Sequence, residues 1–241
     1  MPDEVHEDKL ARWVKSGKPG QAPIEAATVI LLRDTPNGLE TLMLRKNSKI
    51  AFGGMWVFPG GRVDAEDREG LDADDERGAA SRAAVREAQE ETGLVILEQD
   101  MAPFSHWTPP PITPKRFLTW FFAAAAPSGD VVIDDGEIKE HDWMRPGDAL
   151  ERRDAGDIEL APPTFVTLSE LATCTDVDSA LGMARGREPE RFETHIAVGD
   201  NGPVALWHGD AGWQETTLEN EGARHRLSMR KSGWLYERRP T

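Results

Sequence analysis

The sequence predicts a fold of the α/β or α+β class, in which strands and helices alternate along the chain. Three observations predict it: two apolar runs flank Asn37-Gly38, a run of helix formers ends at Gly93, and short strands are expected on both sides of that helix. With 241 residues, the chain is near the upper limit for a single hydrophobic core. We therefore expect one enlarged domain, or one domain with an extension.

The globular part is expected to begin with a β-hairpin. Residues 1–23 are polar and offer nothing that would fix them against a core, which predicts an N-terminal arm. The runs ATVILLR and TLMLR then surround Asn37-Gly38, the strongest short-range hairpin signal. A third strand over residues 55–58 leads into Pro59-Gly60-Gly61. Residues 64–78 are rich in acids and lack an apolar period, which predicts an exposed insertion.

The next element is a helix of three to four turns over residues 79–92. Gly93 stands where a helix commonly ends in the left-handed region. The predicted apolar stripe of this helix comprises Ala80, Ala84, Val85 and Ala88.

Short elements are expected after Gly93, and they complete the division of the chain. Strands are predicted at residues 94–97, 104–108, 116–124 and 131–133, helices near 146–150, 165–172 and 177–184, and β-hairpins from Phe192 onward. These elements predict three parts: the arm at residues 1–23, a main domain at 24–160, and a helical and β-hairpin extension at 161–241.

Composition excludes several classes of function. The chain has 43 acidic residues against 28 Lys and Arg, a net charge of -15, which excludes nucleic-acid binding through bulk charge. Cys174 is the single cysteine, so an internal disulfide and a thiolate metal site are excluded. The sequence contains no apolar run near the roughly 20 residues that span a bilayer, and we expect a cytoplasmic protein without a membrane partner.

A carboxylate cluster is the feature most indicative of chemistry. Residues three and four apart share a helix face, so Glu87, Glu90 and Glu91 are expected to lie together. Their mutual repulsion is typical either of a hydrated surface or of a site for a hard divalent cation, and an oxygen-only ligand set favours Mg²⁺ or Mn²⁺. Arg86 adjoins the cluster and could orient one carboxylate through a forked pair.

The order of these motifs resembles the signature of the Nudix hydrolase superfamily: Gly, five residues, Glu, seven residues, then Arg-Glu-apolar-x-Glu-Glu-x-Gly-apolar. Phe58-Pro59-Gly60-Gly61 precedes the helix, and the helix carries Arg86-Glu87 and Glu90-Glu91 before Gly93. The match covers about residues 24–160. The resemblance implies an α/β/α sandwich with a mixed sheet.

The signature is split in this chain. Six residues after Gly61 stands Asp67, where the family has Glu, and Arg86 follows about eleven residues later than the pattern requires. Asp67 and Glu76 are both candidates for the missing Glu, and the sequence does not choose between them.

The resemblance also implies a mechanism and a ligand set. It implies hydrolysis of a diphosphate linkage in a small nucleoside diphosphate derivative, with Mg²⁺ or Mn²⁺ as cofactor, and it is compatible with a homodimer. The implied metal ligands are the carbonyl of Gly61 and the side chains of Glu87, Glu90 and Glu91. Glu87 would also be the base and Arg86 its orienter. Glu137, or failing that Glu140, would supply an additional acid, although a solvated acidic turn explains both equally well.

The substrate is less closely specified. Arg45, Gly54 and Phe58-Pro59-Gly60-Gly61 match the spacing of a motif in coenzyme A diphosphatases, and the split signature and C-terminal extension resemble the acyl-CoA diphosphatase branch and its bacterial relatives. Lys46 and Ile50 depart from that motif, so Lys46, Lys49 or Arg116 would have to contact the 3′-phosphate of CoA. The alternatives are a hydrolase of NADH or ADP-ribose type substrates and a nucleotide sensor without hydrolysis.

Overall fold

The computed structural model describes residues 6–47, 52–134 and 136–240, and its contacts divide the chain into two compact units. The larger unit comprises Glu25–His106 and Thr119–Glu190. The smaller unit comprises Met1–Ile24, Trp107–Leu118 and Arg191–Thr241. Within the described part of the chain, no helix is both long enough and apolar enough to cross a membrane.

The larger unit is built on one sheet with helices on its faces. The strand order of this sheet is β3-β2-β1-β6-β5-β8, where β8 is Glu190–Glu193, with β4 paired to β1 and β7 paired to β2. Its elements are β1 (Ile24–Thr35), β2 (Gly38–Lys46), β3 (Trp56–Val57), β4 (Gly60–Arg62), η1 (Glu66–Arg68), α2 (Glu76–Thr92), η2 (Glu98–Asp100), β5 (Ala102–Thr108), β6 (Phe117–Ala125), β7 (Ile138–Met144), α3 (Pro146–Asp154), α4 (Pro162–Leu171) and α5 (Val177–Arg185).

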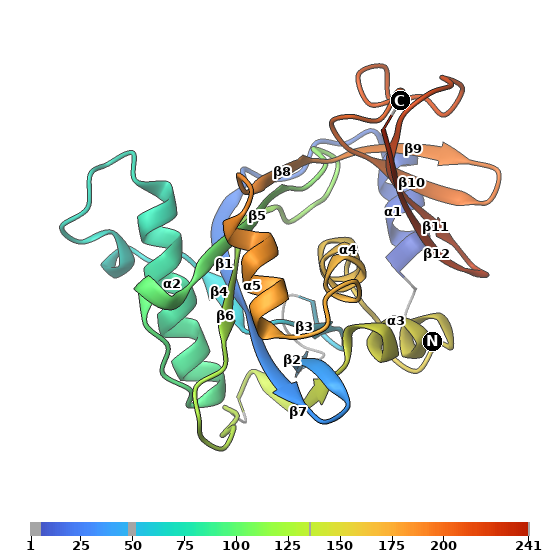
Figure 1. The fold of residues 1–241 in the computed structure, drawn as a ribbon. Coiled ribbons are helices and arrows are strands. Elements are labelled where there is room, and N and C mark those ends of the chain that lie inside the picture. Colours follow the sequence, from blue (N-terminus) through green and yellow to red (C-terminus); the bar gives the residue numbers. More distant parts are fainter. Residues whose placement is uncertain (1–5, 48–51, 135, 241) are drawn as a thin grey trace. The chain divides into compact units, whose positions relative to one another are not determined.

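The α/β/α sandwich with a mixed sheet is confirmed. Helix α2 covers one face of the sheet, and α5 lies on the other side (Figure 1). Every second residue of β1 and β2 points toward α2 and packs against the alanines of that helix. Because the alanine side chains are small, the helix can lie close to the sheet. This part of the core includes Val29, Leu31, Leu42, Leu44, Ala80, Ala83, Ala84 and Ala88.

Two local signals place their elements as predicted. The β1–β2 hairpin forms at the Asn37-Gly38 signal, but its two-residue turn is Pro36-Asn37: Thr35 pairs with Gly38, which begins β2 and has a φ of 109°. Helix α2 ends at Gly93, which has a φ of 71° and donates its backbone N–H to the carbonyl of Gln89. The helix begins three residues earlier than predicted, because Asp75 caps it by accepting a hydrogen bond from the backbone N–H of Gly78.

Two predicted strands are wrong, and two strands, β4 and β7, were missed. Residues 94–97 and 131–133 are not strands, although Leu94, Ile96, Val131 and Ile133 pack on the α2 side of the core. Their apolar residues produced the strand signal, but the described chain gives them no ladder partner. Strand β4 is only three residues long and begins with two glycines, and β7 is largely polar, with several exposed side chains. The pairing of β7 with β2 is not visible in its own sequence.

The smaller unit contains a four-stranded antiparallel sheet of order β12-β11-β10-β9. The hairpins predicted after Phe192 are confirmed, with turns between Gly199 and Gly202 and between Arg230 and Gly233. Trp107 stacks on Phe192 with ring centroids 3.8 Å apart, so these rings are core residues. The elements are α1 (His6–Ser16), β8 (Glu190–Glu193), β9 (His195–Gly199), β10 (Gly202–Leu206), β11 (Arg224–Arg230) and β12 (Gly233–Arg239).

The units do not coincide with the three parts expected from the sequence. The N-terminal segment forms α1 and buries Leu10, so its described residues are not an arm free of a core. Helices α4 and α5, which the sequence assigned to the extension, belong to the larger unit. Helix α1 contacts β9 and β10, which lie far from it in the chain, and composition alone does not reveal such contacts.

Candidate active site

The carboxylate face of α2 lies beside the glycine loop. Strand β4 pairs with β1 so that Gly61 lies opposite Ala27, and this holds Gly61 against the helix. A Cβ atom built at Gly61 would lie 2.3 Å from the carboxyl carbon of Glu87. Only glycine therefore allows the Glu87 carboxylate to approach the backbone at this point.

Arg86 links the acidic side chains around it. Its Nη1 donates to Oε1 of Glu87 at 2.9 Å and to Oε2 of Glu90 at 3.2 Å. Its Nη2 donates to the carbonyl of Arg62 at 2.9 Å. Hydrogen bonding to Asp67 is the main cause that raises the pKa of Arg86 above its usual range. Arg86 thus bonds the carboxylates of Asp67, Glu87 and Glu90 at once.

Asp67 corrects the expectation that residues 64–78 are simply an exposed insertion. It is buried, and it accepts from Nε of Arg86 at 3.2 Å and from Nη2 at 2.9 Å. The backbone N–H of Asp64 donates to the same carboxylate at 2.9 Å. Glu76, the other candidate for the missing Glu, is exposed at the start of α2. The short helix η1 turns Asp67 inward, and sequence periodicity gives no sign of this.

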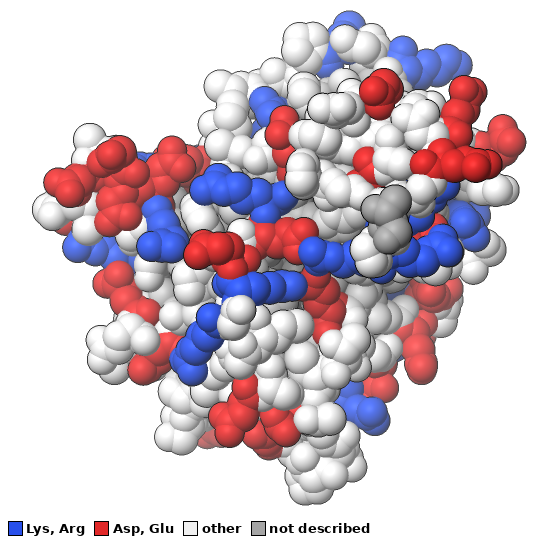
Figure 2. All heavy atoms as spheres, turned by 45° about the horizontal axis from the view of Figure 1, so that its top comes forward, with Lys and Arg blue, Asp and Glu red and all other residues white. Residues whose placement is uncertain are grey.

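The rest of the insertion is an acidic surface, as expected. Figure 2 shows acidic side chains gathered on the lobe at the left, on the side where Figure 1 places the loop between β4 and α2. The acidic residues of this segment besides Asp67 are Asp64, Glu66, Glu69, Asp72, Asp74, Asp75 and Glu76.

Glu91 is the most deeply buried acid of the cluster, at 3% exposure. The backbone N–H of Gly60 donates to its Oε2 at 2.8 Å, and the ammonium of Lys46 donates to its Oε1. Loss of hydration on burial raises the pKa of Glu91, and the same cause raises the pKa of Glu87. Burial therefore disfavours the ionised form of both carboxylates. A nearby cation reduces this free-energy cost.

Lys46 also belongs to this cluster, which the sequence analysis did not predict. The signal was present, because Leu42, Leu44 and Lys46 alternate along β2 and so face α2 together. Its ammonium also lies 3.8 Å from Oε2 of Glu137. Lys46 is thus engaged by acids instead of being free for a substrate phosphate.

The two candidates for the additional acid have different surroundings. Glu137 is exposed and lies next to the Lys46 ammonium. Glu140 accepts a hydrogen bond from Nη1 of Arg45 at 2.5 Å. Glu137 is therefore the one that adjoins the cluster, while Glu140 is paired elsewhere. Lys49 and Ile50, which bear on the CoA motif, lie outside the described residues.

The donor set fits Mg²⁺ or Mn²⁺ in kind. Glu87, Glu90, Glu91 and the backbone at Gly61 offer only oxygen, which these cations prefer. As they stand, the described residues include no group of three acids, histidines or cysteines arranged to hold a metal ion. Arg86 and Lys46 bind these carboxylates in the structure. Each carboxylate has about four lone-pair positions, so the hydrogen bonds present leave acceptor capacity for a cation.

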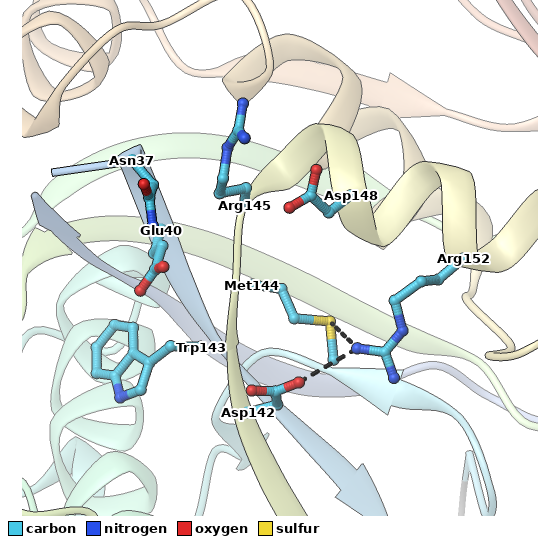
Figure 3. Close-up of a pocket in the computed structure, with 8 residues that line it drawn as sticks. All are labelled: Asn37, Glu40, Asp142, Trp143, Met144, Arg145, Asp148 and Arg152. Carbon is cyan, nitrogen blue, oxygen red and sulfur yellow. Dashed lines mark hydrogen bonds and ion pairs between the residues drawn. The ribbon is translucent and has the colours of Figure 1, made fainter. Parts of the chain in front are cut away.

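A separate cavity of about 310 Å³ lies at the other end of the β2–β7 ladder (Figure 3). There Thr41 pairs with Met144, whereas Lys46 pairs with Ile138 at the cluster. In this cavity Nη1 of Arg152 donates to Oδ2 of Asp142 at 3.2 Å. The lining is Asn37, Glu40, Asp142, Trp143, Met144, Arg145, Asp148 and Arg152, which includes none of the predicted site residues.

Comparison with known proteins adds three findings. The family model described as NUDIX domain matches residues 23–163. A curated relative from Caenorhabditis elegans, "Putative nudix hydrolase 7", is 24% identical over 77% of this chain and 72% of its own length. The crystal structure of a NUDIX hydrolase from Alicyclobacillus acidocaldarius has a TM-score of 0.61 at 23% identity, covering 67% of this chain and 96% of that one. The last likeness establishes the fold.

Proposed function

The chain belongs to the Nudix family of pyrophosphohydrolases, and on this premise we propose that the cluster around Arg86 and Glu87 is its active site. The observation that carries the proposal is the contact between the two halves of the split signature. The Glu87 carboxylate lies against Gly61, and Arg86 bonds both Glu87 and Asp67. The insertion separates these residues in sequence without separating them in space.

We assign the roles as follows. Glu87, Glu90, Glu91 and the Gly61 carbonyl would hold Mg²⁺ or Mn²⁺. A bound divalent cation would neutralise the non-bridging phosphate oxygens and lower the pKa of a bound water. Glu87 accepts the proton of the attacking water, and Arg86 holds Glu87 in place for that step.

Glu137 is the proposed additional acid. Its carboxylate faces the Lys46 ammonium at 3.8 Å and remains exposed, which leaves it accessible to a substrate. Glu140 is the weaker candidate because Arg45 already binds it.

For the substrate we propose CoA or acyl-CoA within the class of nucleoside diphosphate derivatives. The support is the spacing of Arg45, Gly54 and Phe58-Pro59-Gly60-Gly61 in the sequence. Lys46 does not serve as the 3′-phosphate contact in this proposal, because it is buried against Glu91. The remaining candidates for this contact are Lys49 and Arg116.

A substrate panel tests both levels of the proposal. CoA, dephospho-CoA, NADH and ADP-ribose are compared at equal concentration with Mg²⁺ and with Mn²⁺. Cleavage of CoA should give adenosine 3′,5′-bisphosphate and a 4′-phosphopantetheine product. Preference for NADH or ADP-ribose over both CoA forms would reject the CoA assignment, and binding without any cleavage would indicate a sensor.

The active-site assignment has its own variant. Glu87→Gln should lower the rate at least about a hundredfold, since it removes a charge that acts in the transition state. Glu76→Gln, at the exposed start of the same helix, is the matched control and should keep the wild-type rate. Equal turnover by wild type and Glu87→Gln at saturating Mg²⁺ would overturn the assignment.

A further inference from the structure

Lys46 lies between two acids of the proposed site. It donates to Glu91, stands 3.8 Å from Glu137, and is only 8% exposed. Glu91 has its second carboxylate oxygen bound by the backbone N–H of Gly60. Each oxygen of the most buried acid therefore already accepts one hydrogen bond, and the donor at one of them carries a positive charge.

The strand holds Lys46 in this position. The pairing of β2 with β7 shifts register after Arg45, which lies opposite Glu140, so that Lys46 lies opposite Ile138. One residue further on, the backbone N–H of Asn47 donates to the carbonyl of Glu137 at 2.8 Å. The bulge and this bond set Lys46 beside the segment that carries Glu137.

Arg45 shows that the position matters and not the charge alone. It precedes Lys46 on the same strand, so its side chain points to the opposite face. It pairs with Glu140, and both side chains are well exposed, at 37% and 45%.

Resting on the proposed function, we propose that Lys46 is a built-in counter-ion of the carboxylate cluster that competes with the divalent cation for Glu91. In the cation-free protein its ammonium offsets the cost of burying Glu91. When a cation binds, the ammonium either stays and repels it or gives up its bond to Glu91. Both routes lower the affinity of the site for the cation, so Lys46 sets that affinity.

The test measures Mn²⁺ binding in the absence of substrate, by calorimetry at neutral pH. Lys46→Met should bind Mn²⁺ about tenfold more tightly than wild type, because even in bulk water a single charge and a double charge about 5 Å apart interact by roughly that factor. Arg45→Met removes the same charge from the neighbouring position and should stay within about threefold of wild type. Circular dichroism establishes that each variant is folded, and Lys46→Gln replaces Lys46→Met if the latter does not fold.

The outcomes separate this inference from the active-site assignment. An affinity in the Lys46 variant equal to or weaker than that of Arg45→Met would overturn the role of Lys46. If Glu87→Gln leaves Mn²⁺ binding unchanged, the active-site assignment fails, and the inference fails with it. Tighter binding in the Lys46 variant alone, together with weaker binding in Glu87→Gln, is the result we expect.

Discussion

Asp67 accepts two hydrogen bonds from Arg86, one from Nε at 3.2 Å and one from Nη2 at 2.9 Å. The two residues are 19 positions apart, and most of the acidic insertion lies between them. This pair closes the split signature, because Arg86 in turn bonds Glu87 and Glu90. Asp67 therefore acts on the site through Arg86, as a positioning residue.

Asp67→Asn should lower kcat about tenfold or more. The amide offers one acceptor oxygen in place of two and removes the charge, and a hydrogen bond to a charged group contributes about 1.5–3 kcal/mol. Because the effect passes through the orientation of Glu87, KM should change less than kcat. Steady-state kinetics check this, with Asp72→Asn in the exposed part of the insertion as the control. A kcat equal to that of the control would exclude a role for the Asp67–Arg86 pair.

Glu91→Gln should differ from Glu87→Gln in stability. Losing either charge removes some of the mutual repulsion within the cluster. If this were the only effect, both variants would fold normally. Glu91, however, is the buried partner of Lys46, and removing one partner of a buried pair costs about 3–5 kcal/mol. Urea unfolding should show this loss for Glu91→Gln and a much smaller one for Glu87→Gln. Equal unfolding midpoints would mean that the Lys46–Glu91 pair contributes little.

The elements found from sequence are those with local signals. Asn37-Gly38 requires a tight hairpin and Gly93 ends a helix, and both requirements are contained in a few neighbouring residues. β7 was missed because a polar strand pairs through its backbone, so its side chains carry no pattern. Local chemistry thus predicts turns and caps better than it predicts pairing partners.

In the proposed site, too, the features with local signals were predicted and those that depend on long-range contacts were not. The spacing of Glu87, Glu90 and Glu91 on one helix face is a local property, and it was predicted. The places of Asp67 and Lys46 depend on how η1 and β2 meet α2, which involves contacts 19 and 45 residues apart. Both residues are charged but buried, and sequence rules expect charged residues at the surface.

Shortening the insertion should leave stability and Mn²⁺ binding nearly unchanged if the contacts of Asp67 and Asp75 are kept. Replacing residues 70–74 with a shorter Gly/Ser linker retains Asp67 and the helix cap Asp75. Because loop length changes the closure entropy by only about 0.6 kcal/mol for each doubling, stability should change by less than about 1 kcal/mol. Thermal unfolding and Mn²⁺ titration check the variant, whereas extending the cut to Asp75 should cost about 1 kcal/mol more. Lost Mn²⁺ binding with α2 still folded would show that acids in residues 70–74 are ligands.

The pair of Asp210 and Arg226 should make the stability of the smaller unit depend on pH. Asp210 accepts from Nε of Arg226 at 2.7 Å and from the backbone N–H groups of Gly212 and His225 at 2.9 Å. These hydrogen bonds, led by Arg226, outweigh burial and lower the pKa of Asp210. The unfolded chain therefore takes up this proton first as pH falls.

The contribution of Asp210 to stability should accordingly be complete above the ordinary Asp pKa of about 3.9, and it should disappear as pH falls through the lowered pKa of the folded state. Asp210→Asn should be about 3–5 kcal/mol less stable than wild type near pH 7, because Arg226 is then left buried without its partner. The difference should shrink as pH falls below about 4, because the unfolded wild-type chain is protonated at Asp210 there before the folded protein is. Urea unfolding followed by tryptophan fluorescence measures both, with the exposed Asp200→Asn as the control. A difference that stays constant down to about pH 2 would show that the ionised carboxylate is not what stabilises this unit.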